Sequence, residues 1–310
     1  MKKLCKLFSL LLALALLVSC APKGADGTLC FTDSTGYELR LPAKPQRAAV
    51  LFSSLADVWR LAGGEIAVTV GEAIERGFAS ADTPLADDGA GKTINIEVLV
   101  AAAPDLVILS ADIPEQVKAA TLLRDMGIPA ALFRMECFEE YLSVLKIFTT
   151  LCENPEAFRR YGTAQQAQIN TLLAKQPLSG ERILFIRAGT SARSVKAKRS
   201  SDHFAAAMLC ELGAINIADT APILVDGLAM EVILQEDPDR IVFIAMGDEA
   251  ASVAYVTQML SDPTWQSLTA VREGRYGYLS KELFHYKPCA RWAEAYGVLA
   301  EICAQNNDPL

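Results

Sequence analysis

Histidine is scarce in this chain of 310 residues, which contains only His203 and His285. Because tight zinc and manganese sites usually draw on several imidazoles, we expect neither a resident metal nor direct capture of a bare metal ion. The sequence also contains no G-x-S-x-G and no G-x-G-x-x-G motif, the local signatures of hydrolase nucleophiles and dinucleotide-binding turns. A loose P-loop pattern at 86–93 follows no buried strand, which argues against a nucleotide site. We therefore expect no enzymatic activity and no cofactor.

Long hydrophobic runs are missing too, apart from one at the start of the chain. Residues 1–6 carry three lysines, and the apolar run at 7–18 that follows is too short to span a bilayer comfortably. This pattern is typical of a secretory signal peptide. Its ending, L-V-S-C, resembles the lipobox of bacterial lipoproteins, which implies cleavage before Cys20 and a lipid on its sulfur. The alternative is an ordinary secretory signal, with Cys20 in a disulfide.

The chain has no excess of positive charge. Its net charge is −8, and removal of residues 1–19 takes away three lysines and no acidic residue, which leaves −11. An acidic protein of this kind is a poor candidate for binding nucleic acid or anionic lipid surfaces.

Six cysteines remain beyond Cys20, and none has the C-x-x-C spacing of redox or zinc sites. An even number outside the cytoplasm permits disulfides, but several of them occupy apolar helical positions, where a free cysteine behaves as a small hydrophobe. We expect mostly free thiols. The six are Cys30, Cys137, Cys152, Cys210, Cys289 and Cys303.

What the chain does contain is a repeat. The stretch at 94–109, INIEVLVAAAPDLVIL, is echoed at 228–243 by LAMEVILQEDPDRIVF, with an offset of 134 residues. Each copy predicts a short helix with Glu in its first turn, a Pro-Asp break and a buried strand. Two copies so far apart predict two similar lobes. The copies share four identical pairs: Glu97 and Glu231, Val98 and Val232, Pro104 and Pro238, and Asp105 and Asp239.

Strands and helices alternate on both sides of a long segment at 154–176 that is helical and rather polar. This alternation predicts an α/β fold, with two Rossmann-like lobes of mostly parallel sheet joined by one long α-helix. The expected organisation is a signal peptide at 1–19, a tether and hairpin at 20–46, an N-terminal lobe at 47–153, the connecting helix at 154–176 and a C-terminal lobe at 177–310.

This order of parts resembles the substrate-binding lipoproteins of ABC importers for ferric siderophores, haem and vitamin B12. The resemblance covers nearly the whole mature chain and implies the function of an extracytoplasmic, membrane-anchored receptor with an ABC permease as its partner. It also implies that Glu97 and Glu231 dock onto permease arginines, although the helix dipole alone favours an acidic residue in a first turn. The best-matched stretches are 95–97 with 104–108, 201–204 with 212–218, 230–231 with 238–239, and 262–268 with 270–275.

The ligand is expected between the lobes, where the carboxyl ends of parallel strands converge. Arg134 and Arg187 end strands in different lobes and are candidates for clamping an anionic ligand, unless local acids such as Glu136 pair with them. The basic run at 196–199 is expected on a loop, and the three tryptophans in the core. Candidate ligand-binding residues at strand ends are Ser53, Arg134, Arg187, Met246 and Tyr286.

We therefore expect capture of an iron-siderophore chelate, with haem or cobalamin as the alternatives. Basic residues on both lobes favour the siderophore class. The rival functions are an exported two-lobed hydrolase, a receptor for bare metal ions, which the scarcity of histidine disfavours, and a sensor lipoprotein without a transported ligand.

Overall fold

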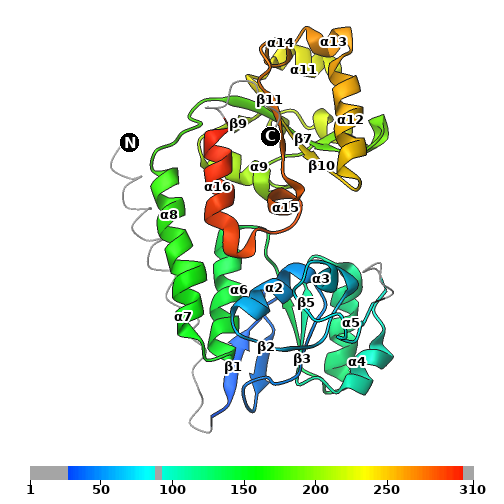
Figure 1. Cartoon of the computed structure of the whole chain (residues 1–310), viewed down its shortest axis with the longest axis vertical. Coiled ribbons are helices and arrows are strands. Elements are labelled where there is room, and N and C mark those ends of the chain that lie inside the picture. Colours follow the sequence, from blue (N-terminus) through cyan, green and yellow to red (C-terminus); the bar gives the residue numbers. More distant parts are fainter. Residues whose placement is uncertain (1–26, 88–92, 303–310) are drawn as a thin grey trace. The chain divides into compact units, whose positions relative to one another are not determined.

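The computed structural model describes residues 27–87 and 93–302 and divides the chain into two compact units. Unit 1 consists of the chain up to Arg134 together with Leu142–Phe158, and unit 2 of Met135–Tyr141 together with the chain from Arg159 onward. Both units have parallel sheets and helices (Figure 1), which confirms the predicted α/β fold class. The predicted signal peptide, Cys20 and Cys303 lie outside the described residues. Within the described ranges, no helix is long and apolar enough to cross a membrane.

The sheet of unit 1 has four parallel strands in the order β4-β3-β5-β6. Its central strand β5 (Leu106–Ser110) is buried at all five positions, as expected for a strand covered on both faces. The other strands are β3 (Ala48–Val50), β4 (Ile66–Val68) and β6 (Ala130–Phe133), and the helices are α2 (Ser53–Leu61), α3 (Gly71–Glu75), α4 (Ile96–Ala102) and α5 (Pro114–Asp125).

The helix α3 lies in the polar, Gly-containing stretch at 71–92, whose sequence pattern predicts a loop, and the structure corrects that prediction. Its sequence GEAIE is short and polar, but Gly71 and Ala73 are buried and Glu72 hydrogen-bonds to Ser53 in α2. Tertiary contacts therefore stabilise a helix whose local sequence pattern is too short to predict it.

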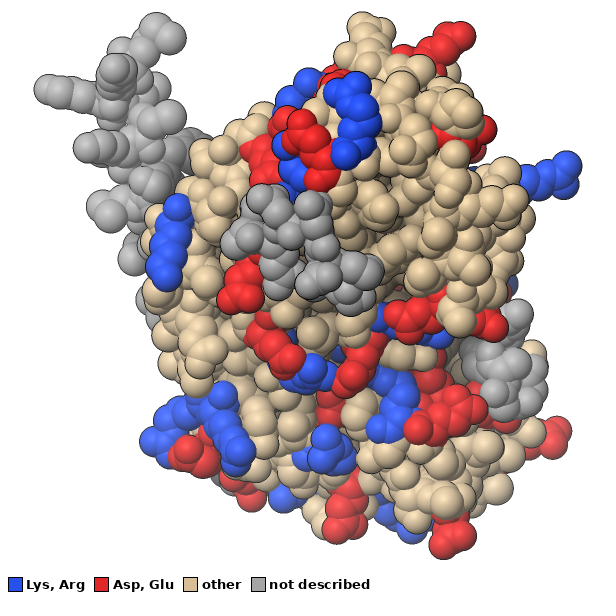
Figure 2. Space-filling model, turned by 45° about the horizontal axis from the view of Figure 1, so that its top comes forward, with Lys and Arg blue, Asp and Glu red and all other residues tan. Residues whose placement is uncertain are grey.

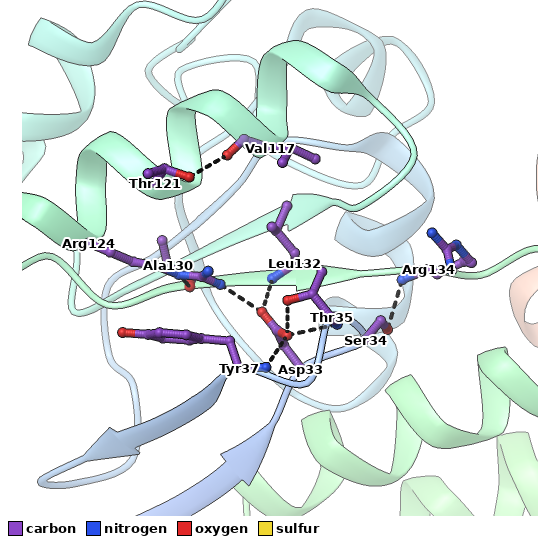
Figure 3. Close-up of polar contacts among 10 residues, drawn as sticks. All are labelled: Asp33, Ser34, Thr35, Tyr37, Val117, Thr121, Arg124, Ala130, Leu132 and Arg134. Carbon is purple, nitrogen blue, oxygen red and sulfur yellow. Dashed lines mark hydrogen bonds and ion pairs between the residues drawn. The ribbon is translucent and has the colours of Figure 1, made fainter.

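The predicted N-terminal hairpin is present as β1 (Leu29–Thr32) and β2 (Glu38–Leu41), which pair antiparallel. Its turn covers the exposed edge of β6 (Figure 3). The buried Asp33 carboxylate accepts hydrogen bonds from the Leu132 amide, at 2.9 Å, and from the Arg124 guanidinium, at 2.7 Å. The Ser34 amide donates to the Leu132 carbonyl at 2.9 Å. The turn thus satisfies backbone groups that an edge strand leaves unpaired.

The sheet of unit 2 is built around β7 (Arg182–Ala188), which pairs parallel with β10 (Arg240–Ala245) and β9 (Ile215–Asn216). The strand β11 (Tyr276–Leu279) extends it on the far side of β10. A short strand β8 (Lys196–Ala197) pairs antiparallel with β7. The prediction that the basic run at 196–199 is a loop is therefore wrong for its first two residues.

Eight α-helices accompany the sheet of unit 2 in the described part of the chain after β7. Figure 1 shows α11 beside α13 and α14, and α16 beside α8. The eight are α9 (Phe204–Glu211), α10 (Ile223–Asp226), α11 (Met230–Glu236), α12 (Glu249–Leu260), α13 (Pro263–Gln266), α14 (Thr269–Arg272), α15 (Lys281–Phe284) and α16 (Trp292–Glu301).

Helical structure also occupies the chain between the two sheets. The helix α6 (Phe138–Leu151) begins in unit 2 and ends in unit 1. The segment predicted as one connecting helix contains α7 (Pro155–Phe158), a π-helical turn at Arg159–Thr163 and α8 (Ala164–Leu173). The boundary between the units falls where the π-helical turn begins. Such turns interrupt the regular hydrogen-bond ladder of an α-helix.

The predictions for tryptophan and cysteine are confirmed for the described residues. Trp59 and Trp292 are fully buried and Trp265 is nearly so. The five described cysteines after Cys20 are thiols that form no disulfide, and burial raises the pKa of the Cys137 and Cys152 thiols to about 11. Since the thiolate is the reactive form, these two thiols are inert at neutral pH.

Candidate functional site

The sequence repeat is also a structural repeat, and it includes an arginine that the sequence alignment missed. In unit 1 the Asp105 carboxylate accepts the Arg47 amide at 3.0 Å, and the Arg47 guanidinium donates to the Ala102 carbonyl at 2.8 Å. This contact fastens the last turn of α4 to the start of β3. We call this arrangement the Asp–Arg clasp.

Unit 2 contains the same clasp. The Asp239 carboxylate accepts the Arg182 amide at 2.8 Å, and the Arg182 guanidinium donates to the Glu236 carbonyl, at the end of α11, at 2.9 Å. The two arginines were not paired by the alignment because both lie outside the aligned stretches, and their separation differs by one residue from the offset of the repeat.

The helices that the clasps hold present the same face. The seven residues of α4 and the seven of α11 are exposed, half-buried or buried in the same order. Each helix has one fully buried side chain, Leu99 in α4 and Ile233 in α11. Glu97 and Glu231 lie in the first turns and are exposed. Among the residues that the structure describes, neither carboxylate has an ion-pair partner.

Three basic residues gather at the carboxyl end of β7 in unit 2. The antiparallel pairing places Lys196 directly opposite Arg187, so the two side chains share one face of the sheet. Lys198 follows, and its amide donates to the Phe185 carbonyl at 3.0 Å. Like charges placed opposite each other destabilise a strand pair, unless an anion binds between them. We call Arg187, Lys196 and Lys198 the basic cluster.

Arg187 is the central member of this cluster. Its side chain is half-buried, and no carboxylate of the described residues lies within ion-pair distance of it. Burial lowers the pKa of Arg187, but an arginine stays charged at neutral pH. Lys196 and Lys198 also have no carboxylate partner among the residues described. Because an unpaired buried charge is costly, Arg187 is suited to bind an external anion.

His203 lies beside the basic cluster and is uncharged at neutral pH. Burial, together with the nearby cations Lys287 and Arg187, lowers its pKa to about 3. Its Nδ1 accepts the Ala205 amide at 3.2 Å and so caps α9, while its ring stacks on Phe204 with 5.0 Å between centroids. The histidine therefore supplies an aromatic surface rather than a charge.

Met246 directly follows β10, as predicted, whereas Tyr286 does not end a strand but follows α15, which comes after β11; both residues are half-buried. The Met246 amide donates to the Ala188 carbonyl at 2.8 Å, which places its backbone beside the end of β7. The Lys281 ammonium lies 6.0 Å from the centre of the Tyr286 ring and donates to the Gly247 carbonyl at 2.9 Å. Lys281 thus connects the chain after β10 to the chain after β11.

Arg134, the ligand-binding candidate of unit 1, forms an ion pair with an acid that the sequence did not suggest. Its guanidinium contacts Asp112 at 2.8 Å, whereas Glu136 contacts Lys287 at 2.6 Å. The Arg134 amide donates to Ser34 Oγ at 2.9 Å, so the hairpin turn fixes its backbone (Figure 3). Its side chain is about half exposed, and a surface pair of this kind is weak enough for a ligand to displace.

Ser53 is less accessible than its position at a strand end suggests. It is 1% exposed, and its hydroxyl contacts the Glu72 carboxylate and the Arg76 guanidinium, the latter at 3.0 Å. Arg76 also stacks over the Phe78 ring at 4.6 Å. No sequence pattern points to Arg76, because it lies in the polar stretch at 71–92 that has no strand or helix periodicity. It is the half-buried cation nearest to Ser53.

The described residues contain no group of three or more His, Cys, Asp or Glu side chains that could hold a metal ion. On the face that Figure 2 shows, the acidic and basic side chains are interspersed and form no broad basic surface among the residues described. Nucleic-acid binding depends on such a surface. The groups available for binding a ligand in unit 2 are the basic cluster and the aromatic rings beside it.

Comparison with known proteins gives a family and a fold. The model of the family described as "Periplasmic binding protein" matches residues 49–283. A search of the curated proteins found no match.

Solved structures share the fold at low sequence identity. The siderophore-binding protein BauB, bound to ferric iron and two molecules of acinetobactin, has a TM-score of 0.70 at 15% identity, over 91% of this chain and 100% of BauB. The catecholate-siderophore-binding protein VctP of Vibrio cholerae has 0.68 at 17%, over 90% and 100%. The vitamin B12-binding protein BtuF of Vibrio cholerae has 0.66 at 16%, over 85% and 98%.

Proposed function

Since this chain belongs to the periplasmic binding protein family, whose extracytoplasmic members bind small molecules for transport, we propose that it captures an anionic iron chelate of the siderophore type and delivers it to an ABC permease. The observation that carries this proposal is the basic cluster of unit 2. Arg187 is half-buried, has no carboxylate partner among the described residues and lies opposite Lys196. The binding of a multiply charged anion relieves both the desolvation of Arg187 and its repulsion from Lys196.

The surroundings of the cluster support a ligand that is aromatic as well as anionic. The rings of His203 and Phe204 stack beside it, and the Lys287 ammonium lies 4.7 Å from the centre of the Phe204 ring. Catecholate groups combine negative charge with a flat ring, and both features suit such surroundings. Two of the proteins that share the fold, BauB and VctP, are siderophore-binding proteins.

Haem and cobalamin remain the alternatives. The specific observation in favour of haem is the pair of half-buried rings of His285 and Tyr286, whose centroids are 5.1 Å apart. That the ligand lies between two lobes, and that Arg134 also contacts it, remain predictions from the sequence.

Isothermal titration calorimetry with three probes tests the ligand class: a ferric tris-catecholate, haem and cyanocobalamin. We expect the ferric chelate to bind most tightly, and Arg187→Ala to weaken it by about 1–3 kcal/mol. Arg193→Ala is the matched control, because Arg193 is exposed and lies on the same β7–β8 connection. If Arg187→Ala and Arg193→Ala titrate alike, the basic cluster is not the binding site; preference for cobalamin excludes the siderophore class.

Delivery and anchoring complete the proposal. The exposed, unpaired carboxylates of Glu97 and Glu231 support docking onto permease arginines, and the L-V-S-C sequence supports a lipid on Cys20. Replacing both glutamates by alanine should abolish uptake and leave ligand affinity intact, and a loss of affinity would place them in the ligand site instead.

Cys20→Ser protein should move from the detergent phase to the aqueous phase on phase separation; unchanged partitioning would contradict the lipid anchor.

A further inference from the structure

The hairpin of unit 1 has a free edge along β2. Among the strands that the structure describes, only β1 pairs with β2, so the other side of β2 has no partner strand. The turn of the hairpin is held against β6, because the Asp33 carboxylate accepts the Arg124 guanidinium and the Leu132 amide (Figure 3). The Arg124 guanidinium also lies 3.7 Å from the centre of the Tyr37 ring. These contacts fix the start of β2 in place.

An open cavity lies beside this edge. Its volume is about 210 Å³, and it is lined by residues 37–40 on one side and by Arg124 with residues 127–130 on the other. The loop before β6 therefore leaves space next to β2. A strand edge that borders open space can pair with an extended segment of another chain through its backbone groups.

The hydrogen bonds of the hairpin show which backbone groups face outward. The Asp33 amide donates to the Tyr37 carbonyl at 2.9 Å, so these two residues form a hydrogen-bonded pair. Along an antiparallel ladder, such pairs alternate with pairs that do not bond each other. The register continues without a break along β2, which makes Glu38 and Arg40 the non-bonded positions. Their amide and carbonyl groups therefore point away from β1, towards the free edge.

The side chains at these two positions carry opposite charges. Glu38 and Arg40 are both exposed and lie on one face of the hairpin, because alternate residues of a strand share a face. Neither side chain forms an ion pair with another residue that the structure describes. Charges on an edge strand usually prevent pairing with other chains. An edge with one charge of each sign is different, because it complements an antiparallel copy of itself.

We propose that the β2 edge pairs antiparallel with the β2 edge of a second copy of this chain, in the register that places Glu38 of each copy opposite Arg40 of the other. In this register the outward backbone groups of both residues bond across the contact, and both charge pairs are opposite in sign. Shifting the register by two residues sets Glu38 against Glu38 or Arg40 against Arg40, which is destabilising. The contact is two-fold symmetric about Leu39, so it closes as a dimer.

This pairing goes beyond ligand capture and does not depend on it. The strand has four residues, so the contact is small and weak in dilute solution. Anchoring on a shared membrane raises the effective concentration of the copies. We therefore expect pairing chiefly at the membrane surface.

Energy transfer between lipidated chains in liposomes measures the pairing, with donor and acceptor fluorescent proteins fused to the C-terminus of separate copies. Glu38→Arg and Arg40→Glu should each weaken self-association about tenfold or more, because two pairs of like charge replace two opposite pairs. A mixture of Glu38→Arg donor and Arg40→Glu acceptor should regain the original transfer, since opposite charges face each other again. The matched controls Glu115→Arg and Lys118→Glu reverse exposed charges of α5 in the same unit and should change nothing.

Absence of energy transfer in the original protein at every surface density would overturn the proposal. Transfer that the two single variants leave unchanged, or that their mixture fails to regain, would also overturn it, because the contact would then lie elsewhere on the chain. Sedimentation velocity of the same variants in Cys20→Ser protein at high concentration should give the same order without the anchor. Ligand affinity should be equal in all variants, so failure of the pairing leaves the proposed function standing.

Discussion

Apart from the clasp that both units share, the helix α4 of unit 1 has a side-chain cap at its N-terminus, whereas the helix α11 of unit 2 has additional contacts at its C-terminus. Asn95 caps α4, and its side chain accepts the Val98 amide at 3.1 Å. The corresponding N-cap of α11 is Ala229, which has no side-chain acceptor. The ends of the two helices that lie nearest to the glutamates are therefore held differently.

At the C-termini of the two helices, α11 is the one that has additional side-chain contacts. Asp237, the C-cap of α11, accepts the Thr269 amide at 2.9 Å and the Thr269 hydroxyl at 2.6 Å, and Arg182 forms an ion pair with Glu236. The C-cap of α4 is Ala103, which has no side-chain partner to offer. What the units share is the Asp–Arg clasp, so the clasp sets the position of the helix and the caps are interchangeable reinforcements.

The largest expected difference between the units is in their stability at acidic pH, because both histidines of the chain belong to unit 2. The pKa of His203 is lowered to about 3 by burial and nearby cations, whereas an unfolded histidine titrates near 6.5. Between these values the unfolded state binds the additional proton, so stability falls as the pH falls from 6.5 towards 3. The loss attributable to His203 is at most about 1.4 kcal/mol for each pH unit.

Urea unfolding at pH 7 and pH 4 measures this contribution. His203→Asn keeps an N-cap acceptor for α9 and removes the titrating group. The variant should lose less stability than the original protein between the two pH values, by up to about 3 kcal/mol. Equal losses would show that His203 does not remain neutral in the folded state.

The next largest expected effect on stability comes from removing the aspartate of either Asp–Arg clasp. Asp105 accepts two backbone amides, of Gln46 and Arg47, whereas Asp239 accepts only that of Arg182. Asp105→Ala should therefore cost about 3 kcal/mol of unfolding free energy and Asp239→Ala about 2 kcal/mol, because charge-assisted hydrogen bonds are lost. Denaturant unfolding checks the order of the two, with the exposed Asp82→Ala as the control. A smaller cost at Asp105 would contradict this account of the clasp.

The smallest expected effect on stability has opposite signs in the two units. Ala103 and Asp237 both have positive φ, 46° and 35°, a region that glycine adopts without strain. Ala103→Gly should stabilise the protein by about 0.5–1 kcal/mol, since it relieves strain and removes no contact. Asp237→Gly should destabilise it by about 1 kcal/mol, because the Thr269 bonds are lost. Thermal unfolding of both variants decides the matter, and stabilisation by both would mean that the Thr269 contacts are negligible.

Much of the fold was predictable because it depends on local patterns. The helix bounds of α6 and α12 and the strand bounds of β11 agree with the sequence periodicity, and the repeat predicted the equivalent helices α4 and α11. The strand β8 was not predictable, because a two-residue strand has no periodicity. The helix α3 was missed for the same reason.

The candidate site depended more on distant contacts. Sequence position correctly placed Arg187 and Met246 at neighbouring strand ends, because parallel strands end at one edge of a sheet. It did not predict that Asp112 pairs with Arg134, or that Arg76 and Glu72 contact the Ser53 hydroxyl. These partners lie about twenty residues away along the chain and belong to other elements.

The sequence by itself determined the alternation of strands and helices, the two copies of the Glu helix and the family resemblance, because apolar periodicity and turn residues act over a few positions. Only the tertiary structure decided which charges remain unpaired. Arg187 lies opposite Lys196 because β8 turns back along β7, and Val100 and Leu234 are exposed because their helices turn Leu99 and Ile233 towards the core. Pairing and exposure depend on packing between distant segments, and no local pattern records that packing.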